Sequence, residues 1–140
     1  MRKIDDDRFR SFRIDGDRIR RARQVHRLDY LARDQLLLLM RGARALLFPS
    51  LYEGFGLPAA EAMALGTPVL TANVSSLPEV TGDAALLVDP YSIEDIGRGI
   101  AALEADGDLH RELSQRGREQ ANKFSPNAYE VGLGRLYESL

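Results

Sequence analysis

Short apolar runs alternate with helical patterns along the chain from residue 44 onward. The first run, 45–48, is continuously apolar, as in a strand covered on both faces. Pro58 then predicts the opening of a helix and Gly66 its end. Further strands are expected to begin at 69–70 and to occupy 84–88. This order of elements predicts an α/β fold with a parallel sheet flanked by helices.

Caps and apolar stripes predict the remaining helices. Asp34 is expected to cap a helix that ends near Gly42, and Ser92 to cap a later one. The later helix has one apolar face, expected to be core and made of Ile93, Ile96, Ile100 and Leu103. Three more helices are expected: a short one at Pro78, one that contains Leu109 and Leu113 and ends before Pro126, and a last one that carries the apolar stripe of 129–140.

The first 28 residues have a weaker pattern. A short strand is expected within 9–14, a helix at 17–23 and a second strand at 25–28. We interpret residues 1–24 as a basic N-terminal segment that contributes a partial strand or helix to the same domain. The main domain is then 25–140, and the length of 140 residues fits one domain in total.

The net charge of −2 is unevenly distributed. Residues 1–44 hold 13 Lys and Arg against 7 Asp and Glu, a net charge of +6, and the remaining residues hold 6 against 14, a net charge of −8. A basic N-terminal third suits an anionic membrane surface, a partner chain or a phosphorylated ligand, and it is equally typical of solvated helix faces. No aromatic residues are interleaved with Arg18, Arg20, Arg21 and Arg23, which argues against nucleic acid.

The composition restricts the chemistry further. The chain has no cysteine, which excludes disulfides and thiolate metal sites and favours a reducing compartment. His26 and His110 lack metal-ligand spacing, so no metal site is expected. No apolar run is long enough to span a bilayer, and three aspartates near the N-terminus are unlike a signal peptide. We therefore expect a cytoplasmic protein.

The segment 48–61 follows a predicted strand and opens a helix, which is where ligands bind in open α/β sheets. Leu57 has no side-chain oxygen to cap this helix, and Pro58 has no N–H. The N–H groups of Ala59, Ala60 and Glu61 are therefore expected to be free for an anion such as a diphosphate, which the helix dipole also attracts.

Two carboxylates flank this turn. Glu53 precedes it and Glu61 is expected in the first turn of the helix. A carboxylate can accept hydrogen bonds from two adjacent hydroxyls, as found on sugars and on ribose. Taken singly, Glu61 is better explained as an acid that stabilises the helix dipole, and Glu53 as an exposed loop residue.

The spacing of these carboxylates resembles the E-x7-E signature of the family 4 retaining glycosyltransferases. The resemblance extends through 62–69, 75–80 and 84–90, and covers roughly residues 25–140. It implies a GT-B architecture, in which two Rossmann-like domains face each other across a cleft. This chain resembles the C-terminal domain, which binds the nucleotide-sugar donor.

The resemblance also implies roles for single residues. Glu53 would hold the donor sugar at the reacting carbon as the catalytic residue, and Glu61 would bind the ribose diol. The other expected donor contacts are the backbone of Gly54, Phe55 and Gly56, the phosphate-facing Leu57, and Tyr30 and Leu31 at the base. The family pattern requires neither a metal nor a cofactor besides the nucleotide-sugar, which is the donor substrate.

The sequence departs from the family pattern in two respects. The arginine and lysine that neutralise the diphosphate in the family have no counterpart upstream of Arg27, and no acceptor domain is visible. We therefore expect this chain to be inactive alone and to need a separate acceptor domain or partner chain. A missing first strand would expose a sheet edge and favour a homodimer. The alternative hypothesis is a non-catalytic interaction module that binds through its basic N-terminal third.

Overall fold

The computed structural model describes residues 25–125, 127–128 and 130. The chain divides into two units, 1–31 and 32–140. Within the first unit, the described residues 25–31 form neither a helix nor a strand. The strand expected at 25–28 is therefore wrong, because isolated apolar residues without a pairing partner do not specify a strand. The elements expected at 9–14, 17–23 and 129–140 lie wholly or mostly outside the described residues.

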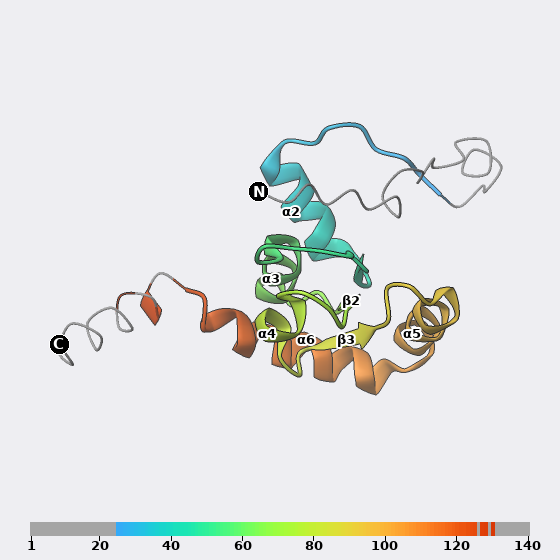
Figure 1. Cartoon of the computed structure of the whole chain (residues 1–140). Helices are drawn as coiled ribbons and strands as arrows, with labels where there is room; N and C mark the ends of the chain where they lie inside the picture. The colour runs from blue at the N-terminus through green and yellow to red at the C-terminus, as the bar shows by residue number, and fades with distance from the viewer. Residues whose placement is uncertain (1–24, 126, 129, 131–140) are drawn as a thin grey trace, which may run out of the picture. The chain divides into compact units, whose positions relative to one another are not determined.

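The second unit contains a parallel three-stranded sheet in the order β1-β2-β3 (Figure 1). Its strands are β1 (Leu46–Phe48), β2 (Val69–Ala72) and β3 (Ala85–Val88). Every residue of the central strand β2 is buried. Val69 and Leu70 belong to two separate hydrophobic clusters, as expected from the alternation of side chains along a strand. The predicted parallel sheet is confirmed.

Five helices accompany these strands within the described residues. They are α2 (Arg33–Gly42), α3 (Leu57–Leu65), α4 (Leu77–Thr81), α5 (Ile93–Ala105) and α6 (Gly107–Asn122). Residues of α2, α3 and α4 build the larger core cluster, and residues of α5 and α6 build the smaller one with β2 and β3. Helix α6 also packs closely on α3, where Gly117 lies against Met63. The flanked sheet predicted from the sequence is therefore present.

Several predicted helix ends are confirmed. Pro58 is the second residue of α3, and Gly66 ends that helix in the left-handed conformation with φ of 76°. The Ser92 hydroxyl accepts the Asp95 N–H at 3.1 Å and so caps α5. Pro78 lies in the first turn of α4. These positions follow from local backbone chemistry, which is why the sequence alone predicts them.

Three expectations are wrong. Asp34 does not cap α2: the cap position is Ala32, whose N–H donates to the Gln35 side chain at 3.2 Å. Leu47 is 47% exposed, so β1 is not covered on both faces by the described residues. The apolar face of α5 is not wholly core, because Ile93 at its first position is 87% exposed. A helical stripe is buried only where another element lies opposite.

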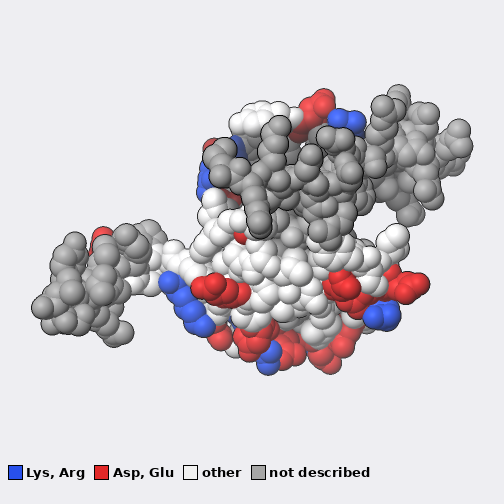
Figure 2. All heavy atoms as spheres, viewed as in Figure 1, with Lys and Arg blue, Asp and Glu red and all other residues white. Residues whose placement is uncertain are grey.

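The charge of the described surface is mostly acidic. Figure 2 shows Asp and Glu side chains, with a few Lys and Arg between them, along the side where Figure 1 places α5 and α6. No helix in the described part of the chain has the length and apolar character needed to cross a membrane. The arginines on which the interaction-module hypothesis depends, Arg18 to Arg23, lie outside the described residues.

Candidate functional site

Two loops meet at the carboxyl edge of the sheet. The loop 49–56 follows β1 and the loop 73–76 follows β2, and the two strands are parallel neighbours. The hydroxyl of Ser75 donates to the Glu53 carbonyl at 2.7 Å and lies 3.2 Å from the Glu53 N–H. Ser76 Oγ lies 3.0 Å from the Glu53 carbonyl and 3.1 Å from that of Phe55. The second loop therefore fixes the shape of the first.

The Glu53 carboxylate is also held in place. Ser50 Oγ donates to its Oε1 at 2.8 Å, and the side chain is partly buried. Within the described residues, its second oxygen has no protein donor. An acceptor oxygen with a fixed position is what a hydroxyl-bearing ligand needs. Sequence analysis did not single out Ser50 or Ser75 as positioning residues, although each lies in the loop that follows a predicted strand.

Gly56 ends this loop in the left-handed conformation, with φ of 97° and ψ of 44°. A Cβ at this position would lie 2.7 Å from the Leu77 side chain, which is fully buried. Gly54, by contrast, has open space around it. Of these two glycines, only Gly56 is required by the backbone and by the packing.

The expectation of three free N–H groups at the start of α3 is wrong. The N–H groups of Ala59 and Ala60 donate to the Gly56 carbonyl at 3.0 and 3.2 Å. Glu61 is the fifth residue of α3, beyond the first turn, where amides bond within the helix. The described residues offer no acceptor for the Leu57 N–H. The donors available to an anion are therefore fewer than predicted and lie at Leu57.

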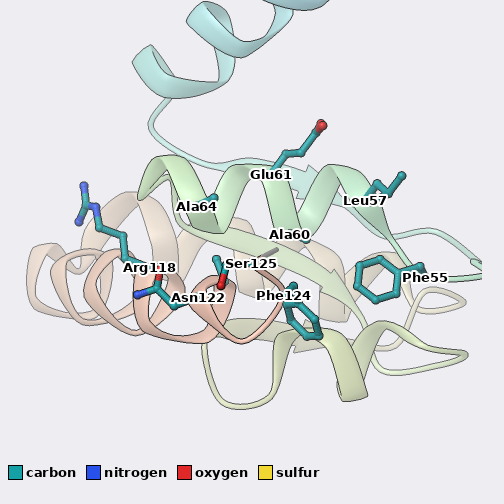
Figure 3. A pocket seen from close by; sticks show the side chains of 10 residues that line it. Phe55, Leu57, Ala60, Glu61, Ala64, Arg118, Asn122, Phe124 and Ser125 are labelled. Atoms are coloured by element: carbon teal, nitrogen blue, oxygen red, sulfur yellow. The ribbon is translucent and has the colours of Figure 1, made fainter. Parts of the chain in front are cut away.

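The Glu61 carboxylate is held by an arginine that sequence analysis did not single out. Arg33 Nη2 lies 2.6 Å from Glu61 Oε1, and no other described residue bonds this carboxylate. Figure 3 shows Glu61 and Leu57 directed away from α6, on a common side of α3. Positions four apart share a helix face, so the exposed Leu57 and the Glu61 carboxylate belong to one surface.

A separate groove lies between α3 and α6. Its volume is about 670 Å³, and the rings of Phe55 and Phe124 meet edge-to-face with centroids 5.3 Å apart. Glu61 borders this groove, but Figure 3 shows that its carboxylate points away. Other lining residues are Leu57, Ala60, Ala64, Arg118, Ala121, Asn122 and Ser125. Glu53 is not among the lining residues and the Glu61 carboxylate points away, so the two carboxylates do not act inside this groove. Nothing in the sequence predicted that Phe124 would line it.

The remaining predicted residues are less constrained. Tyr30 is 96% exposed and Leu31 is half-buried; both belong to the first unit, so their role at the base stays a prediction. Among the described residues, no group of His, Asp and Glu could hold a metal ion. His110 Nε2 instead lies 2.7 Å from the Arg44 carbonyl.

Comparisons with known proteins show the family to which the chain is similar. The model of the family "Glycosyl transferases group 1" matches residues 20–120. The chain is 43% identical over 101 residues to O-antigen chain mannosyltransferase B of Escherichia coli, covering 72% of this chain and 26% of that protein. It is 38% identical over 100 residues to the MMP alpha-(1->4)-mannosyltransferase of Mycolicibacterium hassiacum, covering 69% of this chain and 24% of that protein.

The fold is similar to part of sucrose-phosphate synthase from Thermosynechococcus elongatus. The TM-score is 0.76 at 29% identity, and the match covers 89% of this chain and 33% of that one. The chain thus spans about a quarter of the length of the two mannosyltransferases. Its parallel sheet with flanking helices matches one part of a GT-B enzyme. The chain belongs to the glycosyl transferases group 1 family, as a domain related to mannosyltransferases.

Proposed function

We propose that this domain binds the nucleotide-sugar donor of a retaining hexosyltransferase. The observation that carries the proposal is the pair of carboxylates, Glu53 and Glu61, each with one oxygen held by a neighbour. The remaining lone pairs are available to hydroxyls, and a nucleotide-sugar has vicinal hydroxyls at both of its ends. The Leu57 N–H and the positive end of the α3 dipole lie between these residues in sequence and suit a diphosphate.

In this proposal Glu53 binds the hydroxyls of the donor sugar next to the reacting carbon. Glu61 binds the ribose diol, and the backbone of Gly54, Phe55 and Gly56 lines the sugar and the diphosphate. A carboxylate that is already held in place does not have to reorient during the reaction. It therefore acts by positioning the sugar and by electrostatic stabilisation. The acceptor hydroxyl attacks on the side of the departing diphosphate, which requires no covalent nucleophile from this domain.

The relatives suggest the sugar. Because two of them are named as mannosyltransferases, we propose a mannosyl donor. The acceptor would be bound by residues outside these 140, since the matched part of the chain covers only 26% and 24% of the two mannosyltransferases. Orientation of the two substrates can supply roughly 7–11 kcal/mol of the barrier reduction. The 140 residues alone should therefore bind the donor without measurable turnover.

Titration calorimetry of the 140-residue chain tests the proposal. The ligands are UDP, GDP and ADP, each with and without a mannosyl group. Glu61→Gln should weaken binding of the nucleoside diphosphate by about ten- to a hundredfold, the equivalent of one charge-assisted hydrogen bond. Glu53→Gln should weaken only the sugar-bearing ligand by a similar factor.

The matched control is Glu104→Gln, which removes an exposed carboxylate at the far end of α5. This variant should bind every ligand like the wild type. Equal affinities of the wild type and both site variants for all ligands would refute the assigned roles. Absence of any nucleotide affinity in the folded wild type would refute the proposal itself.

A further inference from the structure

An ion pair connects two helices beside the proposed donor site. Arg33 Nη2 and Glu61 Oε1 are 2.6 Å apart, and the two residues are 28 positions apart in the sequence. The Arg33 side chain is 74% exposed, whereas the Glu61 side chain is 25% exposed. Among the described residues, Arg33 is the one cation bonded to this carboxylate.

Helix stability does not explain an arginine at this position. Arg33 is the first residue of α2, where the helix dipole disfavours a cation. Its neighbour Asp34 is adjacent in sequence, and adjacent residues on a helix do not face each other. The exposure of Arg33 also means that solvent weakens the pair as a stabilising contact. We therefore look for the role of Arg33 in its contact with Glu61.

The geometry leaves Glu61 able to bind a ligand while it is paired. A carboxylate offers two oxygens with about four lone-pair sites, and the described contact occupies one of them. Arginine forms directional bonds from a planar fork, so it can fix the orientation of a carboxylate as well as its charge. Without this contact, the Glu61 side chain would have to be ordered when a ligand binds, which reduces affinity.

We propose that Arg33 is a positioning residue. It holds the Glu61 carboxylate in an orientation in which the carboxylate accepts hydrogen bonds from both hydroxyls of the nucleotide ribose. The inference rests on the proposed function, because it takes Glu61 as the ribose ligand. It adds that the preference of the domain for ribose over deoxyribose depends on a residue of α2 that touches no ligand. Arg33 acts through Glu61.

The test compares ribo- and 2′-deoxyribonucleotides by titration calorimetry, using GDP with 2′-deoxy-GDP and UDP with 2′-deoxy-UDP. The wild type should prefer the ribonucleotide by about tenfold or more, as expected for one hydrogen bond to a charged group. Arg33→Gln should reduce this preference by about three- to tenfold while leaving the affinity for the deoxynucleotide within about twofold. Arg33→Lys should retain part of the preference, because lysine keeps the charge without the planar fork.

The matched control is Arg98→Gln on α5. Arg98 is also 74% exposed and is paired with Asp95 at 2.8 Å, so this variant loses the same charge and a similar ion pair away from α2 and α3. Its ribose preference should equal that of the wild type. Thermal unfolding of all variants separates binding from folding. Should Arg33→Gln unfold early, Arg33→Lys still tests the inference, because it should lose part of the ribose preference while keeping the charge.

Two results would overturn the inference alone. The first is a wild type that prefers ribose together with Arg33 variants that keep the full preference. The second is a higher ribonucleotide affinity in Arg33→Gln, because Arg33 would then compete with the diol for Glu61. A folded wild type that binds none of the four nucleotides would refute the proposed function, and this inference with it.

Discussion

Replacing Gly56 by alanine should be one of the most damaging single-methyl changes in the site loop. Its φ of 97° is in the region that L residues adopt at a cost of roughly 1–2 kcal/mol. The added Cβ would lie 2.7 Å from Cδ2 of Leu77, a fully buried side chain that has little room to move. Overpacking of this kind costs about 1–3 kcal/mol. We therefore expect Gly56→Ala to lower the free energy of unfolding by about 2–5 kcal/mol.

Urea denaturation followed by circular dichroism measures this change. With a slope near 2 kcal/mol per molar urea, the midpoint should fall by about 1–2.5 M. The matched control is Gly54→Ala in the same loop, where an added Cβ meets no atom within 4 Å. Its midpoint should stay within a few tenths of a molar of the wild type. Equal midpoints for Gly56→Ala and Gly54→Ala would refute the reasoning from backbone conformation and packing.

Two further predictions concern α5. Gly97→Ala should stabilise the domain by about 0.5–1 kcal/mol, because Gly97 lies in open space within the helix. Gly99→Ala should destabilise it by about 1–3 kcal/mol, because the added Cβ would lie 2.6 Å from a buried leucine. Urea midpoints of the two variants that shift in the same direction would contradict this. The Asp89 N–H and then Arg98 lower the pKa of Asp95 below its ordinary value of 3.8. The stability from this carboxylate is thus present above about pH 4 and lost as the pH falls through the lowered pKa, so the difference in Tm between wild type and Asp95→Asn should shrink below pH 4; a constant difference would contradict it.

The sequence predicts the fold best where a residue restricts its own backbone. Pro58 and Gly66 delimit α3 because a fixed φ suits a helix start and a left-handed φ suits its end. Asp34 was assigned as a cap and instead lies inside α2, where Gln35 satisfies the cap N–H. A capping residue two positions away from the true cap has the same local pattern. Such boundaries are decided by the tertiary packing of the helix.

In the candidate site, too, the sequence predicts some features and misses others. The motif residues Glu53 and Glu61 were named from the sequence, and so was the helix that follows the loop. The residues that hold them are not predicted. Arg33 and Ser75 make their contacts from other segments, which the sequence pattern does not reveal, and Ser50 makes its contact within the same loop. The number of free N–H groups at the start of α3 was also overestimated. The left-handed conformation of Gly56 turns its carbonyl toward the helix, where it accepts from Ala59 and Ala60. The sequence does not predict this backbone orientation.

The contacts to Glu53 and Glu61 affect how strongly the two carboxylates can bind a ligand. A carboxylate on a flexible side chain must be ordered by its ligand, and that ordering reduces affinity. Here the Ser50 and Arg33 bonds order the two carboxylates in advance, and Ser75 fixes the backbone on which Glu53 stands. The spacing of two glutamates is thus only half of the site. The other half is a set of polar neighbours from the same loop and from two other segments, and through them substitutions outside the motif should alter donor binding.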